Sequence, residues 1–279
     1  MLNLLKDFLG YFKYHLFEVK VEPQLRFEYK FWVIKRFFHV LFLGRSKSKY
    51  YLFPKDIIVS NQFGNFFVPK NSDMILTLSS KSESDLLVFF KVKDNSIFLD
   101  IGGNAGKYST YIAKHFNPKK VYTFEPSPST FEILKKNISL NSFSKINIYN
   151  VGISDSEAKI KFANGRQNSG LSHIIINADE SGTEDFDMIE VDVISLNQFI
   201  VSENIAPTDI DLIKIDVEGH EFNVLKGGTE LLKALPKGAR ILIEIFPDTV
   251  KVAEIIQFIE LYNFSVLKIN IEYYLFTKR

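Results

Sequence analysis

Three clusters of acidic residues and glycines are the places where this sequence can perform chemistry. The first is the segment FLDIGGNAGKYS at residues 98–109, where an apolar run leads into glycines and then into a helical pattern. Glycines at such a turn let the backbone approach a ligand, and the following helix begins with unpaired N–H groups. Asp100 precedes the first glycine, so its carboxylate would repel a pyrophosphate and attract an amino group and a sulfonium. The pattern favours S-adenosylmethionine over a nicotinamide dinucleotide, although similar glycines also occur in turns that bind nothing.

The second candidate is Glu125, at the end of the apolar run VYTFEP (residues 121–126). It follows Asp100 by 25 residues, which is the spacing that a βαβ unit requires. An acid at the end of the second strand can accept two hydrogen bonds from the hydroxyls of a ribose. The alternative is an ordinary surface glutamate at the end of a strand.

The third cluster lies in the segment DLIKIDVEGHEFNVLKGG at residues 211–228. An apolar strand again ends in acids, at the edge where doubly wound sheets bind their ligands. Asp216, Glu218, His220 and Glu221 fall within six residues, and such crowding perturbs pKa values and suits proton transfer. We take Asp216, Glu218 and His220 as the candidates for a general base. The alternative for His220 is a surface position at the start of a helix, where Glu221 would interact with the helix N-terminus.

Strands and helices alternate around these clusters, which is the pattern of a parallel α/β sheet. We expect a strand pair at 56–60 and 65–68. The predicted strands of the main sheet are 97–101, 120–125, 146–153, 210–215 and 240–246, with an antiparallel pair at 264–269 and 272–276. The predicted helices are 106–116, 129–141, 195–204, 221–235 and 249–262. An irregular region at 155–191, with short β runs and His173, either covers the acceptor site or forms a surface hairpin.

These three clusters, in this order, resemble the FkbM family of S-adenosylmethionine-dependent methyltransferases. The specific part of the resemblance is IDVEGHE at 215–221, followed by VLKG at 224–227. The DIGGNAG segment alone would indicate only the wider class of Rossmann-like methyltransferases. Further matches are NVGISD at 150–155, ISLN at 194–197 and IEI at 243–245, with Gly152 replacing the more usual alanine and Asn197 the usual aspartate. The resemblance covers about residues 60–279.

The resemblance implies an α/β, Rossmann-like class I methyltransferase fold: a mostly parallel seven-stranded sheet with an antiparallel C-terminal strand, plus an N-terminal helical appendage. It also implies an O-methyltransferase whose acceptor is a sugar, a glycan or another small natural product. Carried over by position, the cofactor-binding residues would be Asp100, Gly102, Gly103, Asn104, Gly106, Tyr108, Glu125, Asn150 and Gly152. Asp216 would lie near the methionine end and the reacting methyl, with Glu244 as a partner behind it.

Methyl transfer is an in-line displacement at an activated carbon, so the protein mainly positions donor and acceptor and excludes water. A sugar hydroxyl is a weak nucleophile, and a base within hydrogen-bond reach would help. Asp216, Glu218 and Glu244 could gather around a divalent cation. No spacing in the sequence requires a metal, and we expect none.

Charge is unevenly distributed, although the net charge is only +1. Residues 1–55 hold eleven basic and four acidic residues, a net charge of +7, so the remainder carries −6. We expect two parts, a basic, aromatic, helical segment at 1–55 and a methyltransferase domain at 56–279. The segment either packs on the domain as an amphipathic helix or contacts a membrane or an anionic glycan through residues 1–50. Its longest uncharged apolar stretch, 37–43, is shorter than the roughly 20 residues that span a bilayer.

Composition excludes several function classes. Without cysteine, the chain has no disulfide, thiolate metal site or thiol nucleophile. The acidic catalytic part argues against nucleic acid, so we expect a small-molecule or glycan acceptor and no nucleic-acid partner. No export signal is recognisable, and we expect a cytoplasmic protein, at most peripheral to the inner face of the membrane. The alternatives are a methyltransferase-like scaffold that docks on a membrane-associated assembly and an NAD-dependent oxidoreductase, which Asp100 disfavours.

Overall fold

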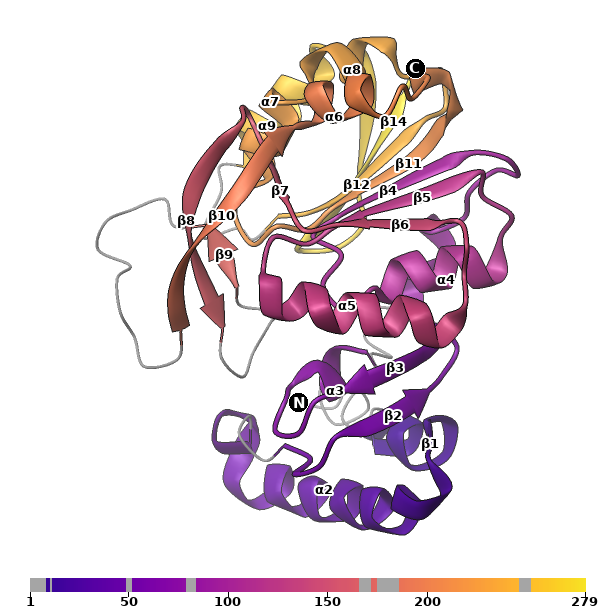
Figure 1. Cartoon of the computed structure of the whole chain (residues 1–279), viewed down its shortest axis with the longest axis vertical. Helices are drawn as coiled ribbons and strands as arrows, with labels where there is room; N and C mark the ends of the chain where they lie inside the picture. The colour runs from indigo at the N-terminus through magenta and orange to yellow at the C-terminus, as the bar shows by residue number, and fades with distance from the viewer. Residues whose placement is uncertain are drawn as a thin grey trace.

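A central sheet lies between two groups of helices in the computed structural model of the chain (Figure 1). The structure describes residues 9–10, 12–48, 52–78, 84–165, 172–174, 186–245 and 252–279. One face of the sheet is covered by α4 (Lys107–His115) and α5 (Pro128–Asn141). The other face is covered by α6 (Leu196–Ser202), α7 (Glu221–Lys226), α8 (Thr229–Ala234) and α9 (Val252–Glu260). The helices predicted at 106–116, 129–141 and 195–204 are thus confirmed, with ends that differ by a few residues, and α9 confirms the described part of the helix predicted at 249–262.

The central sheet has seven strands in the spatial order β13-β14-β12-β11-β4-β5-β6. β14 pairs antiparallel with both β12 and β13, whereas all other neighbours pair in parallel. The predicted fold class is therefore confirmed. The strands are β4 (Ile97–Ile101), β5 (Lys120–Phe124), β6 (Ile146–Tyr149), β11 (Ile210–Ile215), β12 (Arg240–Glu244), β13 (Phe264–Lys268) and β14 (Tyr273–Lys278).

The centre of this sheet explains where a ligand can bind. Every residue of β4 and β11 is buried, as expected for strands that helices cover on both faces. From β4 the chain moves to β5 and β6 on one side, and it later returns to β11 on the other side. In doubly wound sheets such a change of direction opens a crevice at the carboxyl ends of the strands.

The prediction of one continuous strand at 146–153 was wrong. The main-sheet strand β6 ends at Tyr149, and Gly152–Ser154 forms β7, which belongs to a separate four-stranded sheet of order β7-β10-β8-β9. Between them, the Asn150 amide donates hydrogen bonds to the carbonyls of Glu125 (2.9 Å) and Pro126 (3.0 Å), which turns the chain out of the main sheet. The other strands of the second sheet are β8 (Ala158–Gly165), β9 (His173–Ile174) and β10 (Phe186–Ser195).

The predicted helix at 221–235 is instead two helices, α7 and α8, separated by Gly227 and Gly228. A Cβ on Gly227 would lie 2.0 Å from the Ser154 carbonyl oxygen, so only glycine permits this approach of α7 to β7. The Gly227 carbonyl also accepts the Asn197 N–H at 2.9 Å. These contacts with distant segments end the helix.

The N-terminal part is more than a helix. Its elements are a π-helical turn η1 (Tyr14–Glu18), a short strand β1 (Lys20–Val21), a 3₁₀ turn η2 (Pro23–Leu25) and a long helix α2 (Arg26–Ser48). β1 pairs with β2 (Ile57–Ser60), which pairs with β3 (Asn65–Val68), so the predicted strand pair is confirmed as part of a three-stranded sheet. That sheet contains strands from both sides of the predicted boundary at residue 55. The division of the chain into two parts at this residue stays a prediction.

Two asparagines of α5 hold the three-stranded sheet against the main domain. Asn137 accepts the Phe67 N–H (2.7 Å) and donates to the Ala105 carbonyl (2.9 Å). Asn141 accepts the N–H of Asn65 (2.8 Å) and donates to its carbonyl (2.7 Å). Both side chains thus complete backbone hydrogen bonds that would otherwise be lost at a sheet edge.

Candidate active site

The glycine loop after β4 is held between the ends of β5 and β11. The N–H groups of Gly102 and Gly103 donate to the Phe124 carbonyl at 3.1 and 2.8 Å, and the Asp216 N–H donates to the Ile101 carbonyl at 3.1 Å. Gly102 has a φ of +77°, and a Cβ there would lie 1.8 Å from the Asp216 carbonyl oxygen. No other residue fits this turn, which brings the first and third predicted clusters into contact.

A cleft opens at the carboxyl ends of these strands. Two apolar side chains of the second sheet, Phe162 and Ile174, form part of its wall. The edge of the β8–β9 hairpin, within the predicted irregular region, therefore borders the cleft; residues 166–171 and 175–185 lie outside the described part. Six of the predicted site residues line the cleft: Gly102, Asn104, Glu125, Gly152, Asp216 and Glu218.

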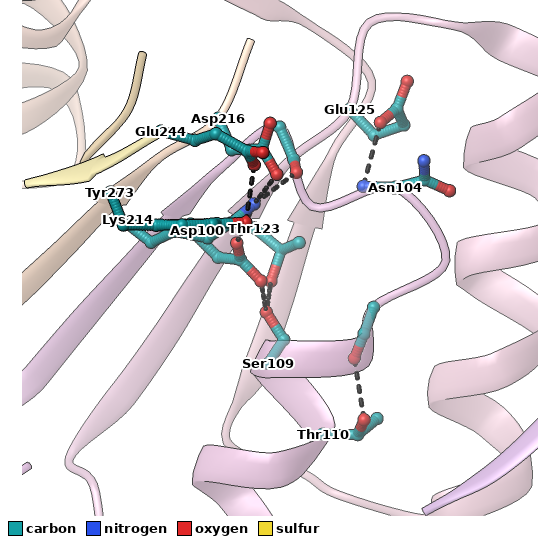
Figure 2. Close-up of polar contacts among 12 residues, drawn as sticks. Asp100, Asn104, Ser109, Thr110, Thr123, Glu125, Lys214, Asp216, Glu244 and Tyr273 are labelled. Atoms are coloured by element: carbon teal, nitrogen blue, oxygen red, sulfur yellow. Dashed lines mark hydrogen bonds and ion pairs between the residues drawn. The ribbon is translucent and has the colours of Figure 1, made fainter. Parts of the chain in front are cut away.

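Glu125 is held in the cleft by two backbone donors. The Asn104 N–H donates to Oε2 at 3.0 Å (Figure 2), and the Ser127 N–H donates to Oε1, also at 3.0 Å. Asn104 donates from a left-handed backbone (φ 47°), a conformation that asparagine tolerates. Burial raises the pKa of Glu125 to about 7, and the two N–H donors oppose that rise. The carboxyl group is thus positioned by the chain and titrates near neutrality.

Beneath the glycine loop lies a buried ionic cluster that the sequence analysis missed. The Lys214 ammonium lies 3.1 Å from Asp216 Oδ2 and 3.5 Å from Asp100 Oδ1 (Figure 2). It also donates to the Gly102 carbonyl at 2.9 Å. Burial alone would lower the pKa of Lys214, but the carboxylates of Asp216 and Asp100 outweigh burial and raise it. A charged residue in the middle of the apolar strand DLIKID was the available sequence signal.

Asp100 belongs to this cluster and not to the wall of the cleft. Its side chain is completely buried, and the Ser109 hydroxyl donates to Oδ2 at 2.5 Å. The Ser109 and Thr123 hydroxyls lie 2.6 Å apart, which links α4 to β5. Asp100 therefore acts through Lys214 and the loop above it, whereas the Asp216 side chain, 25% exposed, reaches the cleft.

Two further glutamates carry perturbed pKa values. Burial, the charge of Asp216 and the charge of Glu221 raise the pKa of Glu218 to about 8. Burial and the charge of Asp216 raise the pKa of Glu244 to about 9, although the Tyr273 hydroxyl donates to its Oε2 at 2.7 Å. The raised pKa of Glu218 agrees with the expectation for this crowded segment. Glu218 also has a left-handed backbone (φ 53°), a strained conformation of the kind that collects at functional sites.

His220, the third candidate for a general base, is not brought to the cleft within the described structure. Its ring lies at the start of α7, with Nε2 2.9 Å from the Ser154 hydroxyl, and burial lowers its pKa to about 4. Glu221 accepts the Gly219 N–H at 2.9 Å, in agreement with its expected role at the start of this helix.

Four other predicted cofactor residues support the site from behind and do not line the cleft as described. Gly103 packs on the Thr123 methyl group, and Gly106 begins α4 with a φ of +86°. The Tyr108 ring stacks on Phe90 with centroids 4.0 Å apart, and Asn150 makes the turn after β6. Among the described residues, no three His, Asp or Glu side chains are arranged to hold a metal ion.

Residues 100–266 match the Methyltransferase FkbM domain. This match begins at Asp100 and ends within β13, so it includes the second and third clusters, the first from Asp100 onward, and the cleft they form. The chain belongs to the FkbM methyltransferase family. The resemblance carried by the third cluster is thereby confirmed. S-adenosylmethionine is the cofactor that this family and the class I fold support, and a cleft whose charged side chains are all carboxylates suits that cationic ligand.

Curated relatives of this FkbM methyltransferase are distant. Methyltransferase 1 of Beauveria bassiana is 26% identical over 147 residues, which is 48% of this chain and 59% of the relative. Hexuronic acid methyltransferase AglP of Haloferax volcanii is 26% identical over 179 residues, which is 63% of this chain and 69% of the relative. The crystal structure of Methyltransferase FkbM from Methylobacillus flagellatus KT aligns with a TM-score of 0.47 at 13% identity, over 99% of this chain and 60% of that chain.

Replacing Lys214 by methionine should destabilise the fold. Lys214→Met removes the cation and leaves Asp100, which is 0% exposed, without it. Breaking a buried ion pair in this way costs about 3–5 kcal/mol of unfolding free energy. Urea unfolding of wild type and variant measures the loss, with Lys237→Met, an exposed lysine, as the control. Equal stability of Lys214→Met and wild type would contradict the role given to this cluster.

Proposed function

We propose that this FkbM methyltransferase transfers a methyl group from S-adenosylmethionine to a hydroxyl of a sugar, a glycan or a glycosylated natural product. The observation that carries the proposal is the cleft at the ends of β4, β5 and β11, which Glu125, Asp216 and Glu218 share. A ribose-binding acid and two acids suited to proton transfer thus border one space. This chemistry needs no metal ion.

In this proposal, different residues of the chain bind different parts of the cofactor. Glu125, positioned by the N–H groups of Asn104 and Ser127, accepts the ribose hydroxyls. Gly102 gives the backbone its close approach, and Asp216 faces the methionine end, oriented by Lys214. When bound, S-adenosylmethionine supplies a methyl group on a positively charged sulfur. The remaining task of the protein is to align the acceptor and remove its proton.

Glu218 is the residue that we propose accepts the proton of the acceptor hydroxyl. It lines the cleft beside Asp216, and its pKa of about 8 makes it a stronger base than an ordinary glutamate. Asp216, the other candidate in the cleft, is engaged by Lys214 at 3.1 Å. His220 is engaged by Ser154 at 2.9 Å, away from the cleft.

Two observations support a carbohydrate acceptor. The relative from Haloferax volcanii is named a hexuronic acid methyltransferase. In this chain, carboxylates crowd the cleft, and they accept hydrogen bonds from neutral hydroxyls while repelling an ionised carboxylate. The first point favours a sugar as the acceptor, and the second favours a neutral hydroxyl over a carboxylate as the group that is methylated.

Cofactor affinity should depend on the ionisation of Glu125. Burial raises its pKa to about 7, and the ionised form accepts hydrogen bonds more strongly, so affinity for S-adenosylmethionine should rise as pH increases through 7. Calorimetry should show Glu125→Gln binding about tenfold or more weakly, without this pH dependence. Glu132→Gln, at an exposed glutamate of α5, is the control. Wild-type affinity in Glu125→Gln would refute the assignment.

Methyl transfer should increase as pH rises through about 8, the pKa of Glu218, and level off above it, because only the ionised carboxylate accepts a proton. With a panel of hexoses and hexuronic acids, Glu218→Gln should lose about 10²–10⁴-fold in rate at pH 8 and lose that pH dependence. Mass spectrometry detects the product, and mild alkali separates a stable ether from a labile ester. An ester product, or a pH profile unchanged in Glu218→Gln, would overturn this mechanism.

A further inference from the structure

Helix α2 presents apolar side chains on two opposite sides. Its inner side packs Tyr29, Trp32 and Val33 into the core, where each is 6% exposed or less. Its outer side carries a second set whose members follow one another by three or four residues, apart from one adjacent pair, which places the set on a single face of a helix. This outer aromatic face consists of Phe27, Phe31, Ile34, Phe38, Leu41 and Phe42, whose exposed fractions range from 39% to 82%.

Such a face is unusual for a surface helix. A helix on a globular domain normally turns polar residues outward, and a contiguous exposed apolar patch marks an interaction site. The rings on this face are ordered against one another: Phe27 stacks on Phe31 with centroids 6.4 Å apart, and Phe38 stacks on Phe42 at 6.2 Å. The face is thus preformed, with large rings directed at solvent.

Helix α2 is rich in basic residues, and two of them lie beside this face. Residues 26–48 contain six basic residues and one acidic residue, a net charge of +5. Lys30 and Lys35 are exposed at its two margins, and the Lys35 ammonium lies 4.6 Å from the centre of the Phe31 ring. The single acid, Glu28, is paired with Lys55 at 2.6 Å. An aromatic face with positively charged margins is complementary to a partner that has an apolar layer beneath an anionic surface layer.

The position of α2 leaves this face accessible. The helix forms the end of the molecule opposite α6–α9, and β2, β3 and α5 separate it from the central sheet (Figure 1). No helix in the described structure is long and apolar enough to cross a membrane. Contact along the plane of a bilayer is the arrangement that suits an amphipathic helix of this kind.

We propose that the outer aromatic face of α2 binds the surface of a bilayer that contains anionic phospholipids. Aromatic side chains are favoured at the membrane interface, and each lysine near an anionic leaflet adds attraction. A second copy of the chain is the less favourable partner, because it would bring Lys30 and Lys35 against a face of the same charge. This proposal does not rest on the proposed methyl transfer.

Co-sedimentation of the full chain with vesicles tests the proposal. Vesicles of phosphatidylcholine with phosphatidylglycerol should bind the wild type about tenfold or more strongly than vesicles of phosphatidylcholine alone. The double variant Phe27→Ser with Phe42→Ser should lose about tenfold or more in binding, and so should Lys30→Glu with Lys35→Glu. The matched control is Val201→Ser with Leu261→Ser, which removes two residues 79% and 80% exposed elsewhere on the chain and should bind as wild type.

Three results would overturn the proposal. The first is a wild type that does not sediment with the anionic vesicles. The second is an equal loss of vesicle binding in the Phe27→Ser with Phe42→Ser variant and in the Val201→Ser with Leu261→Ser control. The third is a dimer in analytical ultracentrifugation that dissociates in Phe27→Ser with Phe42→Ser, without any vesicle binding. Affinity for S-adenosylmethionine, measured on the same samples, should be equal in all variants, so that failure here is distinguishable from failure of the proposed function.

Discussion

The site depends on the interaction of the buried Lys214 ammonium with the carboxylates of Asp100 and Asp216. Removing the Lys214 ammonium and the Asp100 carboxylate from water is costly, and their mutual attraction and hydrogen bonds must offset that cost. Here Asp100 comes from β4 and Asp216 from the end of β11, while the Gly102 carbonyl comes from the loop between β4 and α4. One side chain therefore fixes the two central strands and the glycine loop relative to each other.

In this arrangement, carboxylates outnumber positively charged groups around the cleft. Lys214 neutralises Asp100 below the loop, but Glu218 and Glu244 remain near Asp216, and burial together with its charge raises the pKa of both. The same excess of carboxylates explains two properties of the proposed site. It attracts a cationic cofactor, and it leaves a glutamate that gains a proton near neutral pH. Both properties follow from the order of acids along β11 and β12.

Local patterns in the sequence predicted the strands, the acids at their ends and the glycine turn, because each depends on residues close in the chain. Contacts between distant segments were not predictable. Asn150 bonds back to Glu125 and Pro126 and so divides the strand expected at 146–153. Ser154 lies against Gly227 and divides the helix expected at 221–235, and the same serine holds His220 away from the cleft. Asp100 was expected to bind the cofactor, but its side chain is instead a buried ion-pair partner of Lys214, which comes from another strand.

Hydrogen–deuterium exchange with and without S-adenosylhomocysteine, the demethylated product of the cofactor, tests the central claim most directly. If the ends of β4, β5 and β11 form the cofactor site, the ligand should slow amide exchange in residues 101–106, at Glu125 and Ser127, and in residues 216–219, while α2 and β1–β3 stay unchanged. Protection confined to other segments, or none at saturating ligand, would contradict the claim that this cleft holds the cofactor.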